Sequence, residues 1–292
     1  MWLLTLQLLD PIRRSSVFCG MALFTDQTGN ILSLTAVPKR IISLVPSQTE
    51  LLADLGLTDE VVGITKFCIH PAEWFRNKTR IGGTKDVKKE RIAALSPDLI
   101  IANKEENVKE QVEALQNIAP VWTSHINNLA DAYEMIRQIG LITQKEKKAA
   151  AIIQETEQGF IQLQQYIKTT AGKTCIYLIW KDPYMSIGAD TFIHDMLSRC
   201  KLLNLFVHKN RYPATTPEEL QSLSPELILL SSEPYPFADK HIEALQNILP
   251  RAQIELVDGE MFSWYGSRLM QAPAYFCGLL NRINSSSTSL KS

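Results

Sequence analysis

The chain alternates between short apolar runs and stretches in which apolar residues recur with helical spacing. In the first half, four runs have the length and composition of buried strands: "RIISLV" from Arg40, "EVVGIT" from Glu60, "DLIIA" from Asp98 and "PVWTS" from Pro120. Three stretches between them predict helices: "TELLADLGL" from Thr49, "KKERIAALS" from Lys88 and "NVKEQVEALQNI" from Asn107. This alternation predicts an α/β fold with a mainly parallel sheet covered on both faces.

The second half repeats the first. "ERIAALSPDLIIAN" from Glu90 returns as "EELQSLSPELILLS" from Glu218, and "VEALQNIAP" from Val112 returns as "IEALQNILP" from Ile242. The interval from Pro97 to Pro225 is nearly the same as the interval from Glu113 to Glu243. Two matches in the same order at nearly the same interval indicate two related halves.

One long helix is predicted between the halves. From Thr143 to Ile167 there is no proline, and apolar residues recur every three, four or seven positions. Thr143 and Glu146 have the spacing of a capping box. At ~1.5 Å per residue the helix would exceed roughly 30 Å, which makes it a stiff rod. The expected division is an N-terminal leader or extension with a first strand (1–36), an N-terminal lobe (37–142), the bridging helix (143–168), a C-terminal lobe (169–283) and a disordered tail (284–292).

Composition narrows the function classes. The 292 residues are 45% hydrophobic and 21% charged with a net charge of −1, which suits two globular lobes and gives no basic patch for nucleic acid. No apolar run approaches the ~18 residues of a membrane span. The N-terminus is apolar but lacks the basic flank and cleavage site of a signal peptide, and Met21 is an alternative start. The five cysteines form no CxxC pair.

A cleft between two such lobes is the expected ligand site, because ligands bind at the carboxyl ends of parallel strands. The loops at these ends are rich in aromatic residues, which suit a large, partly apolar ligand. We expect five of them to bind it: Trp180, Tyr184, Tyr212, Trp264 and Tyr265. The alternative is that such residues pack the two lobes against each other.

The stretches "RIISLVPSQTELLADLGLTDEVVGIT" and "GGTKDVKKERIAALSPDLIIAN", with the bridging helix, resemble substrate-binding proteins of ABC importers for vitamin B12 and ferric siderophores. The resemblance extends over about 40–280. It implies two Rossmann-like lobes joined by one rigid helix, a monomer that is not an enzyme, and a location in the periplasm or cell envelope. The ligand would be a metal chelate, such as cobalamin, haem or a ferric siderophore, and the partner a homodimeric ABC permease.

The resemblance also implies one docking glutamate on each lobe, and Glu90 and Glu218 occupy this place in the two repeats. A carboxylate can form a bidentate pair with a permease arginine. The alternative is that both are acidic residues favoured by the positive end of a helix dipole.

Two ligand classes remain open. The aromatic loops favour cobalamin, with Ser47 and Asn103 in two further loops at the cleft. Four cations favour an anionic ferric chelate instead: Lys66, Lys85, Lys104 and Arg268. Cys68 and His70 could form a soft metal pair. Cys200 and Cys277 resemble a cysteine pair that some relatives bridge, which would imply an oxidising compartment.

Two other functions compete with transport. A tetrapyrrole metal chelatase would use His70 with Glu73 or Glu105, whereas a binding protein would show no turnover. A cytoplasmic ligand carrier or sensor would begin at Met21 and would not depend on Glu90 or Glu218 for uptake.

Overall fold

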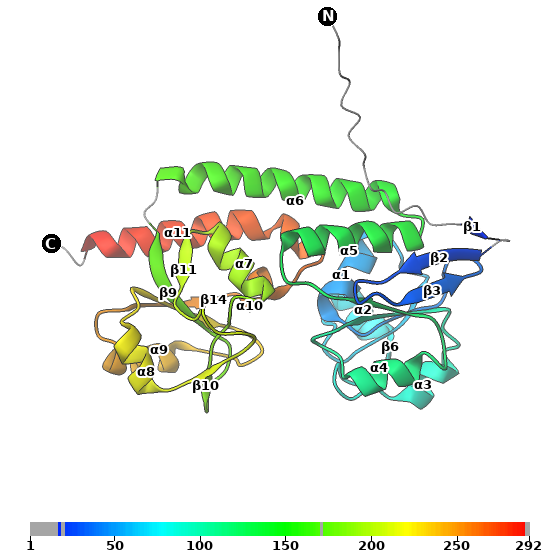
Figure 1. Ribbon diagram of the computed structural model, residues 1–292, viewed down its shortest axis with the longest axis horizontal. Coiled ribbons are helices and arrows are strands. Elements are labelled where there is room, and N and C mark those ends of the chain that lie inside the picture. The colour runs from blue at the N-terminus through cyan, green and yellow to red at the C-terminus, as the bar shows by residue number, and fades with distance from the viewer. Residues whose placement is uncertain (1–16, 19–20, 170–171, 290–292) are drawn as a thin grey trace, which may run out of the picture.

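Two α/β lobes lie side by side in the computed structural model, which describes residues 17–18, 21–169 and 172–289 (Figure 1). The N-terminal lobe contains a five-stranded parallel sheet in the order β6-β5-β4-β7-β8. Its strands are β4 (Ile41–Ser43), β5 (Val61–Ile64), β6 (Thr79–Arg80), β7 (Leu99–Asn103) and β8 (Val121–Ser124). Its helices are α1 (Pro46–Asp54), α2 (Ala72–Asn77), α3 (Lys89–Ala94), α4 (Lys109–Leu115) and α5 (Leu129–Ile142). A hairpin of β2 (Met21–Thr25) and β3 (Ile31–Leu34), extended by β1 (Val17–Phe18), precedes them.

The C-terminal lobe repeats this plan with a four-stranded parallel sheet in the order β11-β9-β13-β14. Its strands are β9 (Lys173–Leu178), β11 (Leu202–Asn204), β13 (Leu227–Ser231) and β14 (Gln253–Val257), with a separate pair β10 (Tyr184–Met185) and β12 (Ala214–Thr215). Its helical segments are α7 (Phe192–Arg199), α8 (Pro217–Leu223), α9 (Asp239–Ile248), α10 (Gly259–Ser263), the 3-10 turn η2 (Ser267–Met270) and α11 (Ala272–Ser289). The predicted architecture of two lobes with parallel sheets is therefore confirmed.

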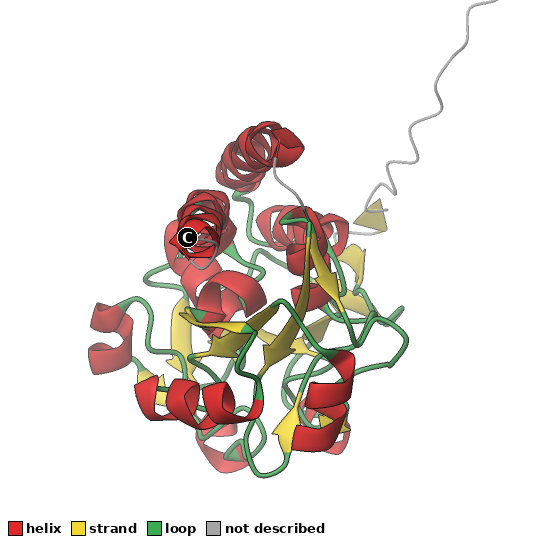
Figure 2. Ribbon diagram, turned by 90° about the vertical axis from the view of Figure 1, so that its left-hand side faces the viewer, coloured by secondary structure: helices red, strands yellow, loops and turns green. Residues whose placement is uncertain are grey.

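Helix α6 (Glu146–Tyr166), followed by the 3-10 turn η1 (Ile167–Thr169), connects the lobes and runs along the top of both in Figure 1. The predicted capping box at its start is wrong. Thr143 instead ends α5, where its hydroxyl donates to the carbonyl oxygen of Ile139 at 2.6 Å, and α6 begins after Lys145 without a side-chain cap. Viewed end-on, α6 lies on top of a layer of other helices, with the sheets below (Figure 2). The apolar side of α6 faces these helices, α5 and α11.

Two further expectations are corrected. Helix α11 continues to Ser289, so most of the segment expected to be a disordered tail is helical. Cys200 and Cys277 are both free thiols in the structure, as are Cys68 and Cys175, so the expected bridge is not formed. Cys19 lies outside the described residues.

The hydrophobic core is continuous from one lobe to the other. The largest cluster contains N-lobe residues such as Ile42 and Ile101, and also one face of the C-lobe sheet through Tyr177 and Leu229. The other face of that sheet forms a smaller cluster of its own, in which Ile228 is fully buried. Because side chains alternate between the faces of a strand, β9 and β13 contribute to both clusters. The lobes are thus coupled by packing as well as by α6. None of the described helices is long and apolar enough to cross a membrane.

A close backbone contact joins the lobes directly beside the cleft. The segment from Gly266 to Met270 packs on α1, where a Cβ atom at Gly266 would lie 2.3 Å from the carbonyl oxygen of Ser47. Only glycine allows the two backbones this approach.

We expect Gly266→Ala to lower the free energy of unfolding by about 1–3 kcal/mol, because neither backbone can move without repacking the junction. Urea denaturation would measure this. The matched control is Gly278→Ala within α11, where an added Cβ atom meets nothing within 4 Å and would stabilise the helix by up to about 1 kcal/mol. Equal stabilities of the two variants would contradict the expectation.

Candidate functional site

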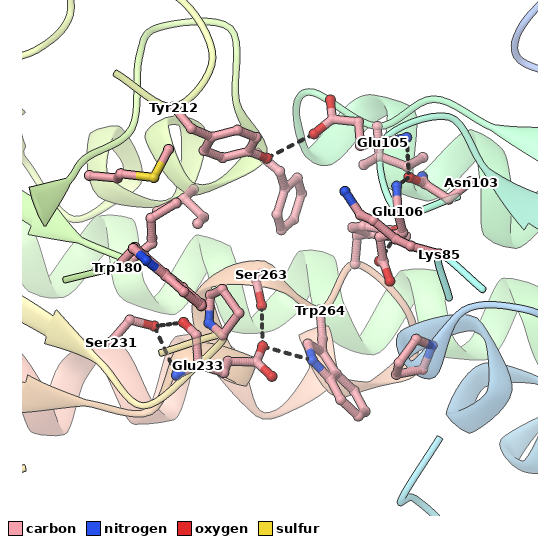
Figure 3. Close-up of a pocket in the computed structure, with 18 residues that line it drawn as sticks. Lys85, Asn103, Glu105, Glu106, Trp180, Tyr212, Ser231, Glu233, Ser263 and Trp264 are labelled. Atoms are coloured by element: carbon pink, nitrogen blue, oxygen red, sulfur yellow. Dashed lines mark hydrogen bonds between the residues drawn. The ribbon is translucent and has the colours of Figure 1, made fainter. Parts of the chain in front are cut away.

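A cavity of about 430 Å³ lies between the lobes, at the carboxyl ends of the parallel strands (Figure 3). This volume is in the range of small-molecule sites, about 300–1,000 Å³. The N-terminal lobe contributes Pro46, Lys85, Asn103, Glu105, Glu106 and Ile126. The C-terminal lobe contributes most of the apolar surface, with aromatic side chains that include Trp180, Phe192, Tyr212, Trp264 and Tyr265.

Asn103, the last residue of β7, shapes the loop that carries the N-lobe carboxyl groups. Its side-chain oxygen accepts hydrogen bonds from the backbone N–H groups of Glu105 at 2.8 Å and Glu106 at 3.1 Å. Asn107 closes the loop by accepting from the backbone N–H of Asn103 at 2.8 Å. Asparagine readily stabilises turns of this kind with its side chain. The loop therefore holds both glutamates at the cavity.

Ser231, the last residue of β13, occupies the position in the second repeat that Asn103 occupies in the first. Its hydroxyl donates to the carbonyl oxygen of Glu233 at 2.6 Å and accepts a hydrogen bond from the Tyr177 hydroxyl at 3.1 Å. Glu233 is the repeat partner of Glu105, and both line the cavity. The internal repeat thus places one carboxyl-bearing loop on each side of the cleft.

Glu106 reaches across to the C-terminal lobe. Its Oε1 accepts a hydrogen bond from the hydroxyl of Tyr265 at 2.8 Å. Burial raises the pKa of Glu106 to about 7, and the nearby carboxyl groups of Glu233 and Glu105 add to this rise, whereas the Tyr265 hydrogen bond and Lys85 oppose it. This carboxyl group therefore titrates near neutral pH.

Glu233 lies against the opposite wall. Its Oε1 accepts from the Ser263 hydroxyl at 2.7 Å and from the Trp264 ring N–H at 3.0 Å (Figure 3). Burial raises the pKa of Glu233; the hydrogen bond from Ser263 opposes the shift, and Glu260 adds to it. Gly259 leaves the room for this side chain, because a Cβ atom there would lie 2.6 Å from the Glu233 Cγ.

Glu105 closes the mouth of the cavity. Its Oε1 lies 2.8 Å from Nη1 of Arg211, and its Oε2 accepts a hydrogen bond from the Tyr212 hydroxyl at 2.8 Å. Arg211 and Tyr212 belong to the C-terminal lobe, so this contact joins the two lobes. In Figure 3 the Tyr212–Glu105 bond spans the upper edge of the cavity.

Arg268 forms a second junction between the lobes. It binds both oxygens of Glu50 on α1, at 2.9 and 2.6 Å, and its Nη1 lies 2.7 Å from Oε2 of Glu260. Its guanidinium group also stacks over the ring of Trp264, 4.7 Å from the centroid. His70 contacts the same Glu260 oxygen at 3.4 Å. The network fixes the orientation of Trp264, which is part of the cavity wall.

Six of the eleven residues expected to bind ligand line the cavity: Lys85, Asn103, Trp180, Tyr212, Trp264 and Tyr265. The other five do not. Ser47 is buried in α1, Tyr184 packs against the smaller core cluster from β10, and Lys104 is exposed. The ammonium group of Lys66 lies over the Phe67 ring, and Arg268 is bound to carboxylates.

The structure does not support the predicted metal pair. Cys68 is fully buried and its sulfur lies within hydrogen-bonding distance of the hydroxyls of Thr49 and Thr65, whereas His70 faces Glu260. Within the described ranges, no group of three or more His, Cys, Asp or Glu side chains could hold a metal ion.

Sequence reasoning missed Glu106, Ser231 and Glu233 as site residues. A signal for two of them was available, because the repeat interval from Pro97 to Pro225 also leads from Asn103 to Ser231 and from Glu105 to Glu233. Glu106 has no such signal, since its role depends on Tyr265 from the other lobe.

Glu90 and Glu218 lie outside the cleft. Each is the second residue of a short helix, α3 and α8 respectively, and each is exposed. A hydrogen bond from Thr216 lowers the pKa of Glu218, so this carboxylate stays ionised. Both helices lie at the lower edge of the lobes in Figure 1, opposite α6.

Comparison with known proteins identifies relatives along most of the chain. A family model described as periplasmic binding protein matches residues 41–250. An uncharacterized ABC transporter substrate-binding lipoprotein of Bacillus subtilis is 27% identical over 213 residues, 70% of this chain and 67% of that protein. A vitamin B12-binding protein of Photorhabdus laumondii is 26% identical over 279 residues, 92% of this chain and 97% of that protein. The crystal structure of a periplasmic vitamin B12-binding protein of Vibrio cholerae has the same fold, with a TM-score of 0.73 at 19% identity, covering 85% of this chain and 98% of that one.

The raised pKa of Glu106 predicts a pH-dependent stability. In the unfolded chain Glu106 has the usual glutamate pKa of 4.5, whereas in the folded protein its pKa is about 7. Between these two pH values the folded protein keeps a proton on Glu106 that the unfolded chain has released. The stabilisation is complete below about pH 4.5 and is lost as the pH rises through about 7, with an upper bound of about 3 kcal/mol.

We therefore expect the free energy of unfolding of the wild type to fall over this pH range relative to that of Glu106→Gln. Urea titrations at several pH values would measure the difference. Glu110→Gln, at an exposed position on α4, should keep the pH dependence of the wild type. Parallel pH profiles for the wild type and Glu106→Gln would show that Glu106 has an ordinary pKa.

Proposed function

Since the chain belongs to the family of periplasmic binding proteins, we propose that it is the substrate-binding protein of an ABC importer, which captures a metal chelate in the interlobe cleft and delivers it to a permease. The observation that carries this proposal is the cavity itself. It lies between two lobes that are joined by one long helix, and its wall combines aromatic faces with polar groups from both lobes. Such a wall suits a ligand with a large apolar ring or ligand shell and polar groups at its edge.

Vitamin B12-binding relatives support cobalamin or a related chelate as the cargo. A cobalamin molecule is larger than the cavity of about 430 Å³, so the lobes would separate at the mouth to admit it. The contacts there are polar and few, mainly those of Glu105 with Arg211 and Tyr212. Hydrogen bonds of this kind are readily exchanged for bonds to water or ligand.

The exposed glutamates Glu90 and Glu218 support docking to a permease made of two identical subunits. They lie in equivalent helices of the two lobes, on the side opposite α6 (Figure 1). A pseudo-twofold arrangement of identical groups fits a twofold symmetric partner. We propose that the protein acts as a monomer and that each glutamate pairs with an arginine of one permease subunit.

We further propose that the protein works in the periplasm or the cell envelope, as the lipoprotein relative of Bacillus subtilis supports. We also propose that it is not an enzyme. The chelatase alternative requires His70 beside the bound tetrapyrrole. His70 instead contacts Glu260 and the edge of Trp264, and it is not among the residues that line the cavity. Its candidate partner Glu105 is held by Arg211 and Tyr212.

Titration with cyanocobalamin, haem and ferric siderophores, followed by quenching of tryptophan fluorescence, tests ligand capture. Saturable binding of one of these is expected. Trp180→Ala should weaken it by about tenfold, because the Trp180 side chain offers an exposed apolar face to the ligand. The control Ile161→Ala removes an apolar side chain from α6 that is somewhat more exposed than Trp180, and it should leave affinity unchanged. Failure of all three ligand classes to bind the wild type would contradict the proposal.

Charge reversal tests docking. Glu90→Lys combined with Glu218→Lys should reduce cellular uptake of the ligand by at least about tenfold, because each substitution replaces an attractive ion pair with two like charges that face each other. Ligand affinity should not change. The control is Glu155→Lys with Glu157→Lys, which makes the same charge change on the exposed side of α6. Normal uptake by the first variant would refute docking through these glutamates, and lost ligand affinity would assign them to the cleft or the fold.

A further inference from the structure

The charged side chains that line the cavity are mostly acidic. The acidic residues are Glu105, Glu106 and Glu233. Lys85 is the one basic residue among the lining residues that the structure describes. The two arginines nearest to the cleft are already paired, Arg211 with Glu105 and Arg268 with Glu50 and Glu260. An incoming anion would therefore find one cationic side chain.

The negative charge of Glu105 is compensated by its ion pair with Arg211 at the mouth of the cavity. Glu105 therefore adds no net charge to the site. Two carboxyl groups remain, Glu106 from the N-terminal lobe and Glu233 from the C-terminal lobe. Each is anchored through one oxygen: Oε1 of Glu106 by Tyr265, and Oε1 of Glu233 by Ser263 and Trp264. Among the described groups, none donates a hydrogen bond to the Oε2 atom of either residue. The two fixed side chains thus offer a free acceptor from each wall.

A ligand must satisfy these groups once it displaces water from the cavity. A neutral ligand with N–H or O–H donors can bond to the free oxygens, whereas a carboxylate or catecholate would face two carboxyl groups with Lys85 as its one cationic partner. Unpaired charge in a site closed to water is strongly unfavourable. The pKa values of Glu106 and Glu233 are raised by burial and by neighbouring carboxyl groups, so the same surroundings that disfavour these two charges would disfavour the added charge of an anionic ligand.

We propose, building on the function proposed above, that Glu106 and Glu233 are specificity residues that select a metal complex with peripheral hydrogen-bond donors and no net negative charge, and that they exclude anionic chelates. The cargo is then an amide-bearing corrinoid or a neutral ferric chelate. The expectation of an anionic ligand bound by lysines and an arginine does not fit, since Lys66, Lys104 and Arg268 are absent from the cavity wall.

Two pairs of probes isolate charge from shape. Dicyanocobinamide carries amides around its corrin ring where dicyanocobyrinic acid carries carboxylates. A ferric tris-hydroxamate is neutral, because three singly charged groups cancel the charge of Fe(III), whereas a ferric tris-catecholate remains anionic. Whichever pair binds, we expect the neutral member to bind the wild type at least about tenfold more tightly than the anionic member. Calorimetry or fluorescence quenching would give the dissociation constants.

The combined variant Glu106→Gln and Glu233→Gln should lose this preference, with the affinity ratio falling about tenfold or more, mainly through tighter binding of the anionic member. Glutamine keeps the shape and one acceptor oxygen, and far-ultraviolet circular dichroism verifies folding. Glu110→Gln is the control and should keep the ratio of the wild type.

A pH series adds a second readout. Glu106 is faced by Tyr265, Glu233, Glu105 and Lys85. Because Glu106 gains negative charge as the pH rises from about 6 to about 8, the preference for the neutral member should increase in the wild type and stay constant in the combined variant, which also removes the carboxyl group of Glu233.

The outcomes separate the two proposals. Anionic members that bind the wild type as tightly as neutral ones would overturn the charge selection while supporting ligand capture. An unchanged ratio in the combined variant would overturn the assignment to Glu106 and Glu233. Absence of binding by all four probes, together with absence of binding by cyanocobalamin and haem, would overturn both the metal-chelate function and the selectivity that rests on it.

Discussion

Arg268 holds together two carboxylates from different lobes, and the shape of the cleft depends on this contact. Glu50 belongs to α1 of the N-terminal lobe and Glu260 to α10 of the C-terminal lobe. Burying the charges of Arg268, Glu50 and Glu260 costs free energy, because each loses contact with water. The two parallel hydrogen bonds from Arg268 to Glu50 offset part of this cost, since bidentate arginine–carboxylate pairs are strong. The same guanidinium group stacks on Trp264. Because Gly266 lies against Ser47 just before Arg268 in the chain, the backbone is also fixed at this point. Arg268 therefore joins the two lobes at this point and supports Trp264 in the cavity wall.

The internal repeat explains how the same scaffold produces a cavity on its inner side and, on its outer side, the matched pair of glutamates for which docking is proposed. One constant interval relates Asn103 to Ser231, Glu105 to Glu233, and Glu90 to Glu218. The first two pairs follow the carboxyl ends of β7 and β13 and face each other across the cleft. The third pair lies in the first turns of α3 and α8, on the side away from α6. Duplication conserves the position of each loop, while the side chains differ enough to make the two walls unlike.

Local patterns were sufficient to predict the architecture. Strand and helix periodicity indicated both parallel sheets and the bridging helix, and the resemblance to importer binding proteins is confirmed by the family match over residues 41–250. The capping of α6 was predicted wrongly because Thr143 satisfies a carbonyl of the preceding helix, α5, and no helix was predicted there from the sequence. Of the four cations expected at the cleft, Lys85 lines the cavity and the other three do not. Arg268 is 218 residues from Glu50, and no local pattern shows that this cation is already paired. Periodicity predicts where the strands and helices lie. The net charge of a site depends instead on contacts between segments that are far apart in the sequence.

The distribution of contacts between the lobes also favours a particular motion. At the back of the cleft the lobes share an apolar core, α6 and the buried Arg268 network. At the mouth they meet through polar groups that water or ligand can replace, such as Glu105 with Arg211 and Tyr212. Apolar packing is lost only at a large cost, whereas exchangeable hydrogen bonds contribute about 0.5–1.5 kcal/mol each. The lobes should therefore separate at the mouth while they stay joined at the back. Such an opening would widen the cavity without disturbing the positions of Glu90 and Glu218 within their own lobes, so the docking proposed for these residues would meet the same local surface on each lobe with the mouth open or closed.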